Sequence, residues 1–233
     1  MHQILTEGLS ELQIPFSEEK LDKFRTYYTM LEEKNAVMNL TAIKGEKDTA
    51  RLHFLDCAAL LSLCGFAGKS VIDIGTGAGF PGIPLKILQP DIALTLLDSH
   101  GKRMNFVSDV CKALGFSETR CLCERAEDVC CDIGGSFDIA VSRAVARLNI
   151  LCELCLPFVH IGGVFIAMKG PDCADELSQA RHAIELLGGG KPEIKTYRIP
   201  GTDIVHSAVL IPKRASTPPL YPRSFGRIKK APL

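Results

Sequence analysis

The stretch that decides the fold of this chain is Val71-Ile72-Asp73-Ile74-Gly75-Thr76-Gly77-Ala78-Gly79-Phe80-Pro81-Gly82. Its apolar first residues suit a parallel strand that is buried on both faces. The glycines that follow give a turn without Cβ atoms, where a ligand can approach the backbone closely. Pro81 and Pro84 fit the first turn of a helix, where a missing N–H group costs nothing. A strand, a glycine-rich turn and a helix in this order predict a loop that binds a nucleotide-type cofactor.

Two glycine patterns overlap in this loop: D-x-G-x-G-x-G from Asp73 to Gly79, and G-x-G-x-x-G from Gly77 to Gly82. The second pattern alone indicates a dinucleotide enzyme, whose ligand places a pyrophosphate at the helix N-terminus. S-adenosylmethionine has no phosphate, and an acidic residue before the glycines suits its ammonium group. The loop therefore favours S-adenosylmethionine, with Asp73 near the ammonium group. The alternative is that Asp73 only forms hydrogen bonds within the turn.

The composition is typical of one sizeable folded α/β domain, with 233 residues, 46% hydrophobic and 23% charged. The formal net charge is zero, so affinity for nucleic acid must come from local clusters of basic residues. No basic-then-apolar signal region opens the chain, so the ten cysteines indicate a reducing, cytoplasmic location. We interpret the cysteines as small buried hydrophobes and expect no metal. No apolar run approaches the roughly 20 residues of a membrane span, so no membrane partner is expected.

The pattern of elements predicts a three-layer α/β sandwich with a mostly parallel seven-stranded sheet. A helix is expected from Ser17, its N-cap, to Met38, and another from Arg51 to about Leu63. Four further strands and a final hairpin follow the loop: 92–97, 120–123, 137–142, 163–168, 194–199 and 203–211. We expect three parts: an N-terminal helical extension (1–66) packed on the core, a catalytic domain (67–213) and a basic C-terminal tail (214–233).

Ligands of open parallel sheets bind at the carboxyl ends of the strands, which directs attention to residues that follow each strand. Asp98 ends the second strand, 23 residues after Gly75, and suits the hydroxyl groups of a ribose. The alternative is that Asp98 caps the next helix. Ala126 and Glu127 follow the third strand and are expected to border the adenine, unless Glu127 is only a solvent-facing residue at a helix start.

Two basic residues follow the fourth and fifth strands, and we expect them beside the methyl donor or the substrate. These are Arg143 and Lys169. The alternative for Arg143 is a structural ion pair with Glu127 or Asp138.

The C-terminal tail is rich in proline and basic residues, and no acidic residue follows Asp203. Tyr221 and Phe225 lie among the basic residues, which suits phosphate contacts combined with base stacking. The tail therefore predicts RNA binding, and the alternative is a solvated tail that only aids solubility. The expected RNA contacts are Arg223, Arg227, Lys229 and Lys230 in the tail, together with Lys102 and Arg103 in the catalytic domain.

Several motifs in order along the chain resemble the RsmG family, also called GidB. They are Asn39-Leu40-Thr41-Ala42-Ile43, His53-Phe54-Leu55-Asp56, the Asp73 to Pro84 loop, Leu97-Asp98-Ser99 with Lys102-Arg103, Ser142-Arg143-Ala144-Val145-Ala146, Lys169-Gly170, Tyr221-Pro222-Arg223 and the segment from Gly226 to Leu233. The resemblance implies a Rossmann-like class I methyltransferase that uses S-adenosylmethionine to methylate N7 of one guanine in 16S rRNA. The implied partner is 16S rRNA or a precursor of the small ribosomal subunit. Phe54 and Cys57 depart from the smaller or hydroxylated residues usual in the family.

The resemblance places cofactor contacts on Gly75, Phe80, Ala126, Glu127 and Arg143. With the residues argued above, the full expected set is Asp73, Gly75, Gly77, Gly79, Phe80, Asp98, Ala126, Glu127 and Arg143. Guanine N7 has a free lone pair, so the reaction needs positioning and no general base. Arg143 and Lys169 are the expected positioning residues, holding the guanine O6 or a phosphate.

Two rival classes stay open from the sequence. A nicotinamide-dependent oxidoreductase fits the G-x-G-x-x-G pattern, although it usually has a further domain. A cofactor-free RNA-binding protein fits the tail but leaves the glycine loop unexplained.

Overall fold

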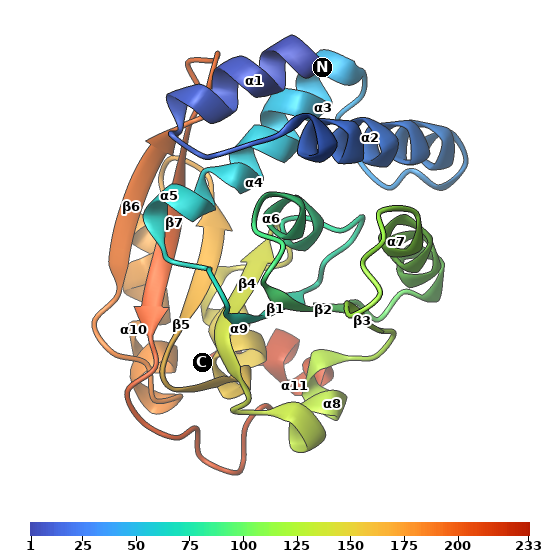
Figure 1. The fold of residues 1–233 in the computed structure, drawn as a ribbon. Helices are drawn as coiled ribbons and strands as arrows, with labels where there is room; N and C mark the ends of the chain where they lie inside the picture. Colours follow the sequence, from blue (N-terminus) through green and yellow to red (C-terminus); the bar gives the residue numbers. More distant parts are fainter.

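The computed structural model describes residues 1–233 and contains a seven-stranded sheet between two layers of helices (Figure 1). The strand order is β3-β2-β1-β4-β5-β7-β6, in which β7 runs antiparallel to its neighbours β5 and β6 and all other pairs are parallel. The predicted sandwich and its final hairpin are confirmed. The strands are β1 (Ser70–Ile74), β2 (Ala93–Leu97), β3 (Arg120–Leu122), β4 (Phe137–Arg143), β5 (Val159–Lys169), β6 (Glu193–Arg198) and β7 (Val205–Pro212).

Alternating residues of the strands enter two separate cores, one on each face of the sheet. Val71 joins the cluster under the first helical layer, whereas its neighbour Ile72 joins the cluster under the second. The first layer contains α6 (Gly82–Leu88) and α7 (Gly101–Ala113). The second contains α8 (Ala126–Ile133), α9 (Leu148–Cys155), the 3-10 turn η2 (Leu156–Phe158), α10 (Ala174–Leu186) and α11 (Phe225–Lys230).

The N-terminal residues form helices that cover the first layer (Figure 1). The elements are α1 (His2–Glu11), α2 (Glu18–Met38), α3 (Glu46–Thr49), a π-helical turn η1 (Ala50–Leu55), α4 (Asp56–Ala58) and α5 (Leu60–Leu63). Ser17 caps α2 as predicted and accepts a hydrogen bond from the Lys20 N–H group at 3.4 Å. The sequence reasoning missed α1, which has no side-chain cap and is held by burial of Leu5 and Leu9.

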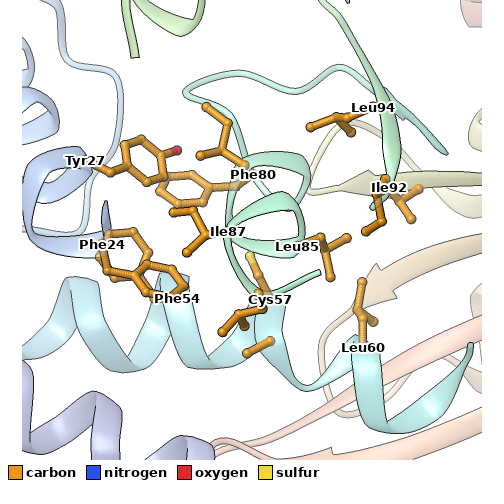
Figure 2. Packing of buried hydrophobic residues seen from close by; sticks show 14 of the residues in the cluster. Phe24, Tyr27, Phe54, Cys57, Leu60, Phe80, Leu85, Ile87, Ile92 and Leu94 are labelled. Atoms are coloured by element: carbon orange, nitrogen blue, oxygen red, sulfur yellow. The ribbon is translucent and has the colours of Figure 1, made fainter. Parts of the chain in front are cut away.

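Aromatic rings pack the N-terminal helices against the loop between β1 and α6 (Figure 2). The ring centroid of Phe24 lies 4.8 Å from that of Phe54, and that of Tyr27 lies 5.3 Å from that of Phe80. The Tyr27 hydroxyl also donates to the carbonyl oxygen of Ala78 at 2.6 Å. These contacts belong to one cluster of 37 buried residues, so the N-terminal helices share a core with the sheet and help to hold the glycine loop.

The C-terminal residues fold back onto the second layer, where the Ile228 side chain of α11 is fully buried. Arg223 forms an ion pair with Glu153 of α9, whose side chain is 1% exposed, with 2.6 Å between the Arg223 Nη2 and Glu153 Oε2 atoms. The segment we expected as a basic arm is therefore partly a packed element. An apolar residue within a basic run is the sequence signal for such packing.

The cysteines are all unpaired, and six of the ten are buried, as the sequence predicts. The interpretation is wrong for Cys123 and Cys131, which are exposed. None of the helices combines the length and apolar character needed to cross a bilayer.

Candidate cofactor and substrate site

The loop between β1 and α6 depends on glycine at three positions where φ is positive. The φ angles are +72° at Gly75, +61° at Gly77 and +107° at Gly79. A Cβ atom would lie 2.4 Å from Val145 at Gly75 and 2.5 Å from Ile83 at Gly79. At Gly77 the nearest atom would be a backbone oxygen 3.9 Å away. Gly75 and Gly79 therefore permit tight packing, whereas Gly77 borders open space that a ligand can enter.

The N–H groups of the loop are almost all used within the protein. Gly75 and Thr76 donate to the Leu97 carbonyl oxygen, and Gly79 and Phe80 donate to that of Thr76. The Gly77 N–H group donates to the Asp98 carboxylate at 3.0 Å. A dinucleotide loop presents such groups to a pyrophosphate. This loop offers no comparable set of donors, so it does not suit a phosphate ligand.

A cavity of about 550 Å³ opens at the carboxyl ends of β1, β2 and β4, beside this loop. This volume is in the usual range for a cofactor site. Eight predicted site residues line it: Gly75, Gly77, Phe80, Asp98, Arg103, Ala126, Glu127 and Arg143. Asp73, Gly79, Lys102, Lys169 and the basic residues of the tail do not line it.

Asp98 is buried at one wall of the cavity and contacts both flanking loops. One carboxylate oxygen accepts from the Gly77 N–H group, and the other accepts from the His100 N–H group at 2.9 Å. The residue thus bonds to the start of α7, as the capping alternative requires. The Oδ1 atom that accepts from this N–H group also lies 3.0 Å from the His100 Nδ1 atom. A carboxylate can accept about four hydrogen bonds, so Asp98 keeps one lone pair, on Oδ2, for a ligand hydroxyl.

Glu127 lies at the start of α8 and is largely buried, unlike the solvent-facing alternative. Its carboxylate accepts from the Phe225 N–H group at 3.2 Å, and Phe225 also lines the cavity. The C-terminal segment therefore completes the wall beside Ala126 and Glu127. Sequence reasoning assigned Phe225 to RNA stacking and missed this place.

Asp73 is fully buried beneath the loop instead of in the cavity wall. One carboxylate oxygen accepts from the Thr76 hydroxyl at 2.7 Å and from the Gly82 N–H group at 2.8 Å. The other oxygen has no partner. Burial raises the pKa of Asp73 to about 6. The geometry matches the turn-forming alternative, since Asp73 joins the loop to the start of α6.

Arg143 is the last residue of β4 and lines the cavity, with its guanidinium 4.7 Å from the centre of the Phe80 ring. It donates to the Leu52 carbonyl oxygen at 3.3 Å, to the Asp56 carboxylate at 3.2 Å and to the His53 Nδ1 atom at 2.7 Å. It contacts neither Glu127 nor Asp138, which the ion-pair alternative named. Arg143 is therefore fixed by the turn η1 and α4.

The His53-Asp56 motif has a clear structural place that sequence reasoning missed. Asp56 is buried, and besides Arg143 it accepts from the Tyr197 hydroxyl at 2.9 Å and contacts the His206 Nδ1 atom at 2.8 Å. His53 stacks on Phe80 with ring centroids 4.2 Å apart. Polar residues three positions apart in an apolar helix lie on the same face. This spacing of His53 and Asp56 is the sequence signal for a shared contact.

Lys169 forms an ion pair with Glu176 at 2.7 Å and donates to the Ala146 carbonyl oxygen at 2.9 Å. These contacts hold it outside the cavity, so the structure does not bring it together with Arg143 as a pair of positioning groups. On the basic surface, Arg103 lies 3.7 Å from Asp98, whereas Lys102 is exposed. Arg227, Lys229 and Lys230 are exposed on α11 without an ion pair, and Arg223 is bound to Glu153.

The residues present fit S-adenosylmethionine by their chemistry. Gly77 leaves room at the loop, Asp98 is a buried acceptor suited to ribose hydroxyl groups, and the loop lacks the donor set that a pyrophosphate requires. No group of three or more His, Cys, Asp or Glu side chains is arranged to hold a metal ion.

Comparison with known proteins also indicates a methyltransferase. Residues 20–204 match the family described as GidB, rRNA small subunit methyltransferase G. The chain is 45% identical to the Ribosomal RNA small subunit methyltransferase G of Clostridium botulinum (strain 657 / Type Ba4), over 99% of this chain and 98% of that protein. It is 41% identical to the protein of the same description from Clostridium tetani (strain Massachusetts / E88), over 100% and 98% of the two chains.

Solved structures of methyltransferases share the fold at low sequence identity. A SAM-dependent methyltransferase from Aquifex aeolicus has a TM-score of 0.52 and 16% identity, over 70% of this chain and 93% of that one. TrmN from Thermus thermophilus has a TM-score of 0.53 and 19% identity, over 67% and 48%. These similarities confirm the predicted class I methyltransferase fold.

Proposed function

The chain belongs to the rRNA small subunit methyltransferase G family, and from this we propose that it transfers a methyl group from S-adenosylmethionine to N7 of one guanine in 16S rRNA. The enzyme class and the cofactor are those of the family. The observation that carries the proposal is the cavity beside the glycine loop, with Asp98 in its wall and no phosphate-binding set of N–H groups. The same observation argues against a nicotinamide-dependent oxidoreductase.

We assign the cofactor to the part of the cavity formed by β1, β2 and α8. Asp98 accepts from the ribose hydroxyl groups, Ala126 and Glu127 border the adenine, and Gly75, Gly77 and Phe80 border the amino-acid part. Asp73 and Gly79 support the loop from beneath. When bound, S-adenosylmethionine supplies a methyl group on a positively charged sulfur, which makes that carbon electrophilic.

The protein's contribution to the reaction is positioning. Guanine N7 carries a lone pair, so no side chain has to remove a proton. Burial, together with the charge of Arg143, lowers the pKa of His53 to about 3, so this imidazole stays neutral and is not a proton acceptor at neutral pH. We assign Arg143 to positioning of the guanine, since its guanidinium is fixed on three sides and still lines the cavity. Lys169 supports the loop after β4 through its bond to Ala146.

We propose that the RNA backbone is held by basic residues near the cavity and on the tail: the exposed Lys102, Arg227, Lys229 and Lys230 and the partly exposed Arg103. Arg223 is excluded because its side chain already neutralises Glu153. Residues 1–66 then form the wall of the cavity on the substrate side, and residues 67–213 bind the cofactor. Residues 214–233 complete the cavity wall and bind the RNA. We place the reaction in the cytoplasm, on 16S rRNA or a precursor of the small subunit.

The test is transfer of labelled methyl groups to small-subunit rRNA from cells that lack the protein, followed by mapping of the modified base. We expect one modified guanine. Replacing that guanine by 7-deazaguanine should abolish transfer, because the nucleophilic nitrogen is then absent, while the other guanines serve as an internal control. Modification of a different atom, or binding of NAD with none of S-adenosylmethionine by calorimetry, would overturn the proposal.

A further inference from the structure

Thr41 lines the cavity on the side of the N-terminal helices and makes three hydrogen bonds within the protein. Its N–H group donates to the Asn35 side-chain oxygen at 2.9 Å, which fixes the backbone. Its hydroxyl oxygen accepts from the Ile43 N–H group at 3.1 Å and lies 2.8 Å from the Nε2 atom of His53. His53 lines the same cavity.

The direction of the bond between His53 and Thr41 follows from Arg143. A guanidinium has only donors, so at 2.7 Å from Arg143 the Nδ1 atom of His53 must be the acceptor. A neutral imidazole that accepts at Nδ1 carries its proton on Nε2. His53 therefore donates from Nε2 to the Thr41 hydroxyl oxygen.

These bonds leave the Thr41 hydroxyl with only its hydrogen free to form a further hydrogen bond. A hydroxyl oxygen has two lone pairs, and here one accepts from His53 and the other from Ile43. Its hydrogen has no acceptor in the protein. At the cavity wall, Thr41 can donate a hydrogen bond and cannot accept one.

We propose that the Thr41 hydroxyl donates to the O6 carbonyl of the target guanine and so selects guanine over adenine. The inference rests on the proposed function. O6 and N7 lie on the same edge of guanine, so a donor to O6 also locates the reacting nitrogen. Adenine presents an amino donor at the corresponding position, which Thr41 has no lone pair to accept.

The position of Thr41 favours a contact with the substrate base instead of the cofactor. Asp98 and Ala126 line the cavity from the β2 and β3 side, which suits the adenosine part of the cofactor. Thr41 comes from the loop after α2, His53 from η1 and Arg143 from the end of β4, which lies across β1 from β2 in the sheet. The substrate must enter on that side once the cofactor fills the first.

The test combines a change in the protein with a change in the base. The variants are Thr41→Val, which has nearly the same shape without a hydroxyl, Thr41→Ala, and the conservative Thr41→Ser. Each is assayed with RNA that carries guanine or 2-aminopurine, which lacks O6, at the target position. Thr41→Val should lower kcat/KM for guanine RNA by at least about 3- to 10-fold, the usual effect of removing the one hydrogen bond to O6, and Thr41→Ser should restore it. Thr41→Val and Thr41→Ala also remove the acceptor of the His53 Nε2 and Ile43 N–H groups, so some activity should be lost with both RNAs. The decrease should be smaller with 2-aminopurine RNA by the factor of about 3- to 10-fold that the bond to O6 contributes.

Three outcomes would overturn the inference. Equal decreases with both RNAs would show that Thr41 is only structural, and Thr41→Ala decides this if Thr41→Val does not fold. A parallel rise in the Kd of S-adenosylmethionine by calorimetry would assign the donor to the cofactor's carboxylate. An unchanged kcat/KM would remove Thr41 from recognition. Failure of the parent protein to methylate N7 would instead refute the proposed function.

Discussion

Replacing Arg223 by alanine tests whether the basic tail is a packed element or an RNA-binding arm. The Arg223 side chain donates to Glu153 from Nε at 2.8 Å and from Nη2 at 2.6 Å, and Glu153 is 1% exposed. Removing one partner of a buried ion pair costs about 3–5 kcal/mol, because the other charge is left buried. Since Arg223 is 18% exposed and its backbone N–H group still reaches Glu153, we expect the free energy of unfolding to fall by about 2–4 kcal/mol.

Urea unfolding measures this decrease, and Arg227→Ala is the matched control because Arg227 is exposed and unpaired on the same segment. The control should change the free energy of unfolding by less than about 0.5 kcal/mol. It should instead weaken RNA binding and make its log–log salt slope shallower by up to about 0.7–0.9 for each phosphate that the protein no longer neutralises. Arg223→Ala should also weaken S-adenosylmethionine binding, because the neighbouring Phe225 lines the cavity.

The converse pattern would refute this reasoning. If Arg223→Ala keeps its free energy of unfolding and its cofactor affinity but binds RNA more weakly, Arg223 is an RNA-binding residue and the ion pair contributes nothing. A combined Glu153→Leu and Arg223→Met variant gives a second check. It should recover part of the stability, since neither charge is then left buried alone.

Three further predictions concern the loop and its acids. Asp98→Ala should weaken cofactor binding by about 1–3 kcal/mol in calorimetry, and unchanged affinity would show that Asp98 acts only on protein N–H groups. Gly77→Val should abolish cofactor binding, since its side chain enters the cavity, while the positive φ costs about 1–2 kcal/mol of stability in urea unfolding. The raised Asp73 pKa means that the cofactor-free fold loses stability as the pH rises from about 4 to 6, by up to about 3 kcal/mol. Asp73→Asn should therefore be at least as stable as the parent at pH 8 and lose that advantage by pH 4, as thermal unfolding at the two pH values will measure.

The fold could be predicted because its signals are local. Buried strands are continuous apolar runs, and the glycine loop and the Pro200-Gly201 turn mark the places where the pattern changes. The parallel sheet then brings strand ends to one edge, so Asp98, Ala126 and Arg143 were expected together from their positions alone. The missed helix α1 has no side-chain cap at its start, and its burial of Leu5 and Leu9 depends on residues distant in the sequence.

The prediction of the site was least accurate where one side chain contacts several elements. Asp73 and Asp98 are both acids at strand ends, yet one lies beneath the loop and the other in the cavity wall. The difference depends on which face of the strand each occupies and on the packing of α6. Similarly, Lys169 and Arg223 look like available cations in the sequence, but Glu176 and Glu153 lie beside them only in the folded chain.

The cavity wall extends along the chain from Leu40 to Phe225, so it exists only when almost the whole chain is folded. A ligand that binds only the folded state stabilises it by about 2.7 kcal/mol at a hundredfold excess over its Kd. Cofactor binding therefore lowers the population of the unfolded state, which is the state that proteases cleave. A cell that depletes its methyl donor is expected to shorten the lifetime of this enzyme as well as to stop its reaction.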